Sequence, residues 1–85
     1  MNEKKWLFEE AINKTHPKWN KDHSAMGENR HYAAKDAARL LDIAEGCKPI
    51  DRDIWVKDVE GGEQFLMGVT VEFDALGVYR HARDI

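Results

Sequence analysis

Two segments in the second half of the chain, residues 53–59 and 64–73, alternate apolar and polar side chains with the two-residue period of β-strands. Gly61 and Gly62 lie between them, and a Gly-Gly pair is favoured in the two-residue turn of a β-hairpin. The pattern therefore predicts a hairpin with its turn at these two glycines.

A two-residue turn fixes the register of this hairpin and, with it, the two faces of the sheet. Glu60 is then expected opposite Glu63, and Trp55 opposite Gly68. Because side chains alternate between faces, one face becomes almost entirely apolar and needs a cover. Its members are Ile54, Val56, Phe65, Met67, Val69, Val71, Phe73 and Val78.

The first half of the chain shows two stretches with helical spacing. Residues 3–14 predict a first helix, which should end before Pro17 because the residue before a proline avoids the helical region. Its apolar stripe consists of Leu7, Phe8, Ala11, Ile12 and Thr15. A polar connection over 16–27 follows, and residues 28–45 predict a second helix that stops at Gly46. The stripe of this second helix consists of Ala33, Ala37, Leu40, Leu41 and Ala44.

Together these segments predict a single α+β domain over 1–85 with the element order ααβββ. The two N-terminal helices are expected to pack on one face of a three-stranded antiparallel β-meander. Asp74-Ala75-Leu76-Gly77 has the residues that favour a type I turn, so the third strand is expected at about 78–82.

Composition narrows the possible partners. The chain of 85 residues carries a formal net charge of -3 and is acidic mainly in its second half. Residues 49–85 hold four Lys or Arg against eight Asp or Glu, which disfavours binding of a phosphate backbone by the strands. No segment reaches membrane-spanning length, and the N-terminal pattern does not fit a signal peptide, so we expect a cytoplasmic protein. Cys47 is the single cysteine and fits a reducing compartment.

The face of the sheet opposite the apolar one is the first candidate site. It carries Trp55, Lys57, Leu66, Tyr79 and His81, and the acidic hairpin adds Asp58, Glu60 and Glu63. Aromatic residues are enriched at protein interfaces. We therefore expect a small non-enzymatic protein-binding module, a regulator or inhibitor, that docks through this face and hairpin. Two alternatives for the face stay open: a cover formed by the 16–27 loop through Trp19, and pairing with a second copy in a symmetric dimer.

The basic segment between residues 14 and 31 supports an alternative function, because single-stranded nucleic acids are bound by cations around a stacking ring. The candidate nucleic-acid-binding residues are Lys14, Lys18, Trp19, Lys21 and Arg30. Such binding would depend strongly on salt.

No catalytic residue, metal site or cofactor is predicted. His16, His23 and His31 are separated by gaps that match no common zinc pattern. Nothing in the sequence places Cys47 or Ser24 within hydrogen-bond reach of a histidine. We therefore expect that the protein is not an enzyme.

Overall fold

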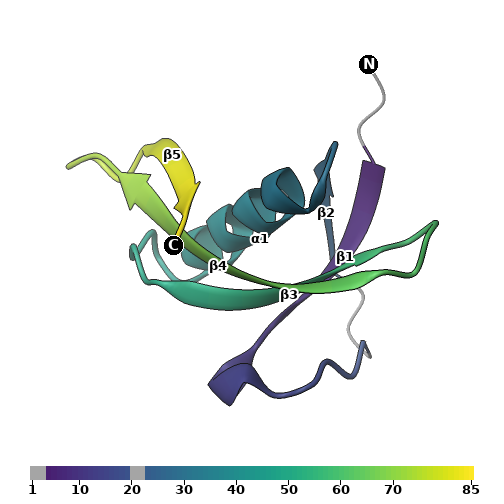
Figure 1. The fold of residues 1–85 in the computed structure, drawn as a ribbon. Helices are drawn as coiled ribbons and strands as arrows, with labels where there is room; N and C mark the ends of the chain where they lie inside the picture. The colour runs from purple at the N-terminus through teal and green to yellow at the C-terminus, as the bar shows by residue number, and fades with distance from the viewer. Residues whose placement is uncertain (1–3, 20–22) are drawn as a thin grey trace.

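Five antiparallel strands form one curled sheet in the order β2-β1-β3-β4-β5, and helix α1 lies against its concave side (Figure 1). The computed structural model describes residues 4–19 and 23–85, apart from the side chain of Lys14. The elements follow one another as β1 (Lys4–Glu10), the 3-10 turn η1 (Ile12–Lys14), β2 (Ser24–Gly27), α1 (Arg30–Ala44), β3 (Arg52–Asp58), β4 (Gln64–Phe73) and β5 (Tyr79–Asp84). The architecture is a small single α+β domain.

The predicted arrangement of two helices and three strands is wrong, because residues 4–10 form a strand. Trp6 and Phe8 are 4% and 5% exposed, while Leu7 and Glu9 are half-buried, so burial follows a two-residue period. The Trp6 indole donates a hydrogen bond to the Gly27 carbonyl on β2, at 3.0 Å. Pairing of β1 with β2 and β3 therefore provides burial and a hydrogen-bond partner that a helix over the same residues would not.

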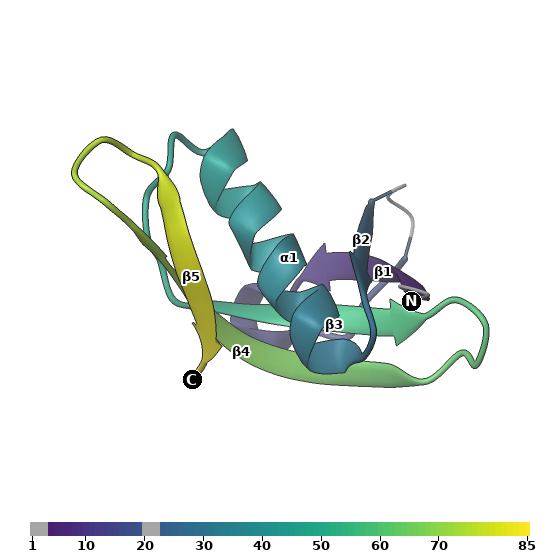
Figure 2. The ribbon, with the colours of Figure 1, turned by 90° about the horizontal axis from the view of Figure 1, so that it is seen from above.

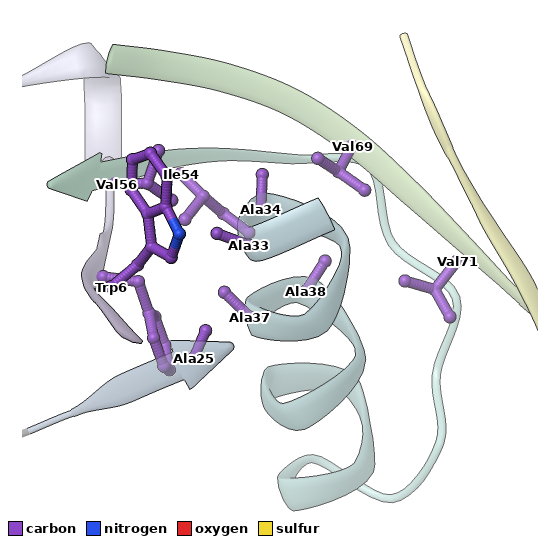
Figure 3. Close-up of a cluster of buried hydrophobic side chains, with 11 residues drawn as sticks. Trp6, Ala25, Ala33, Ala34, Ala37, Ala38, Ile54, Val56, Val69 and Val71 are labelled. Carbon is purple, nitrogen blue, oxygen red and sulfur yellow. The ribbon is translucent and has the colours of Figure 1, made fainter. Parts of the chain in front are cut away.

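Helix α1 lies within the stretch in which the second helix is predicted. The Asn29 side chain accepts hydrogen bonds from the backbone N–H groups of His31 and Tyr32, at 3.0 and 3.3 Å, and so caps the first turn. Gly46 follows the last turn with φ +93°, a conformation that favours glycine. The helix residues that face the sheet are small and fully buried: Ala33, Ala34, Ala37 and Ala38. Their size brings the helix backbone close to the strands (Figure 3).

The hydrophobic core fills the space between α1 and the concave face of the sheet (Figure 3). Ile54 and Val56 on β3 and Val69 and Val71 on β4 are completely buried there. These side chains belong to the face that the alternation predicts as apolar, and Phe65, Met67 and Phe73 pack against the same cluster.

The β3–β4 hairpin has a register two residues away from the predicted one. Ile54 lies opposite Met67 and Trp55 opposite Leu66, where a two-residue turn would place Val69 and Gly68. The loop is longer because Asp58 and Glu63 close it: the Asp58 N–H donates to the Glu63 carbonyl at 2.9 Å. A difference of two residues leaves every side chain on its predicted face, since the period of the strand is two.

Within the described residues, no helix is long and apolar enough to cross a membrane.

Candidate functional site

The convex face of the sheet, predicted as open, is partly covered by the chain itself. The Trp55 indole donates a hydrogen bond to the Thr15 carbonyl at 2.7 Å, and the His16 ring lies 5.5 Å from the Trp55 ring. Trp55 is half-buried as a result. The covering segment follows η1, and Figure 1 shows η1 on the side of the sheet opposite α1.

Trp19 and Glu9 hold this cover in place. A carboxylate oxygen of Glu9 on β1 accepts hydrogen bonds from the backbone N–H groups of Lys18 and Trp19, both at 2.9 Å. The Lys57 ammonium lies 5.7 Å from the Trp19 ring, within range of a cation–π interaction. The alternative in which Trp19 covers the face therefore describes the structure better than a fully open face. Trp55 and Lys57 are engaged within the chain.

The tip of the β3–β4 hairpin stays exposed and projects beyond the N-terminal end of α1 (Figure 2). Asp58 organises the tip: its side chain accepts a hydrogen bond from the Glu60 N–H at 2.9 Å, and its carbonyl accepts one from the Gly62 N–H at 2.7 Å. Backbone N–H groups of Gly61 and Glu60 lower the pKa of the Asp58 carboxyl, and Lys4 at 3.2 Å contributes further. The loop is therefore tied to a carboxylate that favours its charged form.

Two further carboxylates at the tip have no such partner. Glu60 and Glu63 are exposed, and neither forms an ion pair with a described residue. Val59 at the same tip is 49% exposed, and Leu66 on the convex face of β4 is 38% exposed. We call Val59, Glu60, Glu63 and Leu66 the hairpin surface. It combines apolar area with negative charge.

The structure separates Tyr79 and His81 from that surface. A bulge between Glu72 and Phe73 shifts the register of β5, and Tyr79 lies opposite Phe73 on the concave side. There its ring is 6.4 Å from the Phe73 ring and 5.9 Å from the Arg39 guanidinium on α1. His81 lies at the outer strand and contacts Glu72 at 3.3 Å.

The basic residues of the nucleic-acid hypothesis do not form one surface. Trp19 lies on the convex side beside Lys57, whereas the Arg30 guanidinium lies 4.6 Å from the ring of Phe65, a core-facing residue of β4. The Lys18 side chain is exposed near Trp19. Lys21 and the Lys14 side chain lie outside the described residues.

The three histidines between residues 16 and 31 contact three different parts of the fold. His16 packs on Trp55, His23 stacks on Phe8 at 5.4 Å, and His31 pairs with Asp84 at 3.0 Å. Cys47 is a half-buried free thiol. In the described part of the chain, no group of three or more His, Cys, Asp or Glu side chains is arranged to hold a metal ion.

A groove of about 670 Å³ over the outer side of α1 does not follow from the sequence pattern. It runs between β2 and β5 and is lined by Met26, Tyr32, Lys35, Asp36, Arg39 and Tyr79, among others. The helix residues recur at intervals of three and four, a spacing that also describes an ordinary solvated helix face. The sequence signal therefore does not distinguish the groove from plain surface.

The second feature that was not predicted is a buried cluster of charges around Arg52. Its buried guanidinium donates to Asp42 Oδ1 on α1 at 2.7 Å and to Glu10 Oε2 on β1 at 2.6 Å, and it also contacts Glu45. Burial alone would lower the pKa of Arg52, but the carboxylates of Asp42 and Glu10 outweigh burial and raise it. The cluster joins α1, β1 and β3. A signal exists, because Arg52 precedes Ile54 by two residues and therefore shares its apolar face.

Comparison with known protein families, curated proteins and solved structures finds no match to this chain. Its function is therefore inferred from its own surface and charge.

Proposed function

We propose that the chain is a small non-enzymatic protein-binding module, a regulator or inhibitor that docks through the hairpin surface onto a basic patch of a partner protein. The observation that carries the proposal is the pair of exposed carboxylates, Glu60 and Glu63, on a projecting tip that also exposes Val59. Complementary charge steers association, and a central apolar contact excludes water from the interface.

Rigidity of the tip supports this function. Asp58 accepts a hydrogen bond from within the loop and pairs with Lys4 on β1, so the two glutamates are presented by an ordered backbone. Ordering a loop before binding reduces the entropy that is lost on association. The proposal replaces Trp55 as the centre of the surface, because Thr15 and His16 already contact that side chain.

A pull-down from a lysate of the source tests the proposal with the double variant Glu60→Lys/Glu63→Lys. The matched control is Glu28→Lys/Asp51→Lys, which reverses two exposed carboxylates that are not part of the tip. We expect a protein that the wild type and the control retain and that the hairpin variant loses, with retention unaffected by nuclease. Equal retention by both variants would contradict the proposal.

Recovery that disappears after nuclease treatment would instead favour the alternative function, binding of nucleic acid through Lys18, Trp19 and their basic neighbours. That result would also show a strong dependence on salt, since binding to phosphates releases counterions.

A further inference from the structure

Residues 15–19, which we call the covering segment, lie over the convex face of the sheet without belonging to the core. Among the described residues, the hydrophobic cluster beneath α1 contains none from this segment. Thr15, His16 and Lys18 are exposed. Segments that bury little apolar surface open locally at a lower free energy than the whole fold.

Polar contacts hold the covering segment at both of its ends. At the start, the Thr15 carbonyl accepts the Trp55 indole N–H at 2.7 Å, in an exposed position. At the end, one carboxylate oxygen of Glu9 accepts the backbone N–H groups of Lys18 and Trp19, both at 2.9 Å. Water competes for such bonds, so each contributes little to holding the segment closed.

The backbone of Trp19 opposes the closed arrangement. Its φ of +53° lies in the left-handed region, which a bulky side chain rarely adopts and in which it is strained. When the segment lifts, Trp19 can return to an ordinary backbone conformation. The open form is therefore closer in free energy to the closed form than the contacts alone would place it.

The Trp55 side chain beneath the covering segment adjoins the hairpin surface. Trp55 lies opposite Leu66 in the β3–β4 ladder, and opposite residues share a face of the sheet. Leu66 already belongs to the hairpin surface. Lifting the segment therefore extends the exposed apolar area from Leu66 to the indole ring without a gap. Tryptophan is enriched among the side chains that dominate binding energy at protein interfaces.

We propose that the covering segment opens and that Trp55 then binds the same partner protein as the hairpin surface. This inference rests on the proposed function, because it adds a regulated part to the same site. The occupant is the partner of the hairpin surface because Leu66 makes the two areas continuous. With the segment closed, the partner meets the hairpin surface alone. With the segment open, the partner also meets Trp55.

The charge on Glu9 controls the opening. Glu9→Gln keeps the size of the side chain but removes the charge that strengthens its bonds to two backbone N–H groups. We expect this variant to raise the fraction of open segment by about fivefold or more. A matched control is Glu28→Gln, which neutralises an exposed carboxylate that makes no described hydrogen bond with the segment.

Hydrogen exchange of the indole N–H groups measures the opening in the isolated chain. The Trp6 indole is the internal reference, because it is buried and bonded to the Gly27 carbonyl. Exchange at Trp55 should be about fivefold faster or more in Glu9→Gln, with no change at Trp6 and none in the control. Glu9 does not itself accept the Trp55 indole N–H, so the acceleration reports on the segment. Unchanged exchange at Trp55, or an equal acceleration at Trp6, would overturn a local opening.

Retention of the hairpin partner in the pull-down tests the role of Trp55. If only the open form offers Trp55, a larger open fraction raises the apparent affinity in proportion. We expect Glu9→Gln to retain more partner than the wild type and the control, and Trp55→Ala in the Glu9→Gln background to abolish the gain. Circular dichroism checks that the double variant folds. Trp55→Phe is the milder second variant and should abolish part of the gain.

The outcomes separate this inference from the proposed function. Faster exchange at Trp55 without a gain in retention would contradict the inference and leave the hairpin surface as the site. A gain that survives both Trp55 substitutions would contradict it as well. A chain that captures no protein through Glu60 and Glu63 would contradict the proposed function and this inference together.

Discussion

The two ends of the sheet are stabilised in different ways. At one end, β2 is only four residues long, Ala25 is 1% exposed, and the Met26 N–H is bound by Asp36 of the helix. At the other end, β5 is six residues long and mostly exposed, and its Asp84 meets the helix through a pair with His31 that is itself exposed.

This difference shows how one helix serves five strands. Helix α1 is held to β1 and β3 by the buried Arg52 cluster and to β2 by Asp36, whereas its polar contact with β5 lies in solvent. Interactions in solvent contribute little, and interactions of buried charges are costly to break. The fold therefore has a closed half, which holds β2, β1 and β3 to the helix, and an open end at β5.

The largest expected effect is that of Arg52→Met in the closed half. Its removal leaves the fully buried carboxylate of Asp42 without its partner, which should lower the free energy of unfolding by about 3–5 kcal/mol. Urea denaturation measures the change. The control, Arg83→Met on β5, removes an arginine whose side chain is 65% exposed and should change stability by at most about 0.5 kcal/mol. Equal losses in the two variants would remove the distinction between the two ends.

A smaller loss is expected for Gly27→Ala on β2. A Cβ atom at this position would lie 2.7 Å from the Tyr32 Cβ and 2.8 Å from the Ala33 backbone nitrogen, so strand and helix must separate. Overpacking of this kind costs about 1–3 kcal/mol. At Gly68, which neighbours β5, the nearest atoms are 3.5 Å away, and Gly68→Ala should be tolerated. Thermal unfolding of both variants compares the two ends, and a destabilised Gly68→Ala protein would argue against a looser open end.

Asp36→Ala tests the closure of the β2 edge. The variant loses the acceptor of the Met26 N–H and the partner of Arg39, which should lower stability by about 1–2 kcal/mol. Hydrogen exchange at the Met26 amide should accelerate in the same variant. Asp84→Ala at the other end should change stability by at most about 0.5 kcal/mol, because its pair with His31 is exposed. An unchanged Met26 exchange rate would show that Asp36 does not close the edge.

The smallest expected effect is on the stability of the fold at acidic pH. Because folding lowers the pKa of Asp58, the stability that this carboxylate contributes is complete above its ordinary pKa and is lost as the pH falls through the folded value. Urea midpoints measured from neutral pH to below about pH 4 should therefore fall less steeply for Asp58→Asn than for the wild type. The variant also loses the ion pair with Lys4, so it should be slightly less stable at neutral pH. If the urea midpoints of the two proteins fell equally with pH, this would contradict a role for Asp58 ionisation in holding β1 to the hairpin.

Local patterns predict much of the fold but not the first strand. The alternation in 53–73 assigns Ile54, Val56, Val69 and Val71 to the buried face, because a two-residue period needs no tertiary information. Residues 4–10 satisfy helix and strand spacing equally over so short a length. The strand is selected over the helix by pairing with β2 and β3 and by the hydrogen bond from Trp6 to Gly27. These partners are distant in the sequence, so the local pattern does not contain them.

The sequence predicts only part of the candidate site, because the rest depends on contacts between segments of the chain. The exposure of Glu60 and Glu63 follows from their position next to the turn. The cover on Trp55 depends on how residues 15–19 turn back over the sheet, where Trp19 adopts φ +53° and Glu9 binds two backbone amides. A bulge in the β4–β5 ladder moves Tyr79 to the other face, and nothing in the local pattern marks that bulge.

The register of the β3–β4 hairpin has a consequence for how this molecule can change by mutation. Because faces repeat every two residues, insertion or deletion of two residues on each strand next to the tip keeps every remaining side chain of the hairpin on its face. Each such step moves the acidic tip by about 6.6 Å along the strands, since a strand rises about 3.3 Å per residue. The reach of the hairpin can therefore be lengthened or shortened in discrete steps while the packing beneath α1 stays as it is.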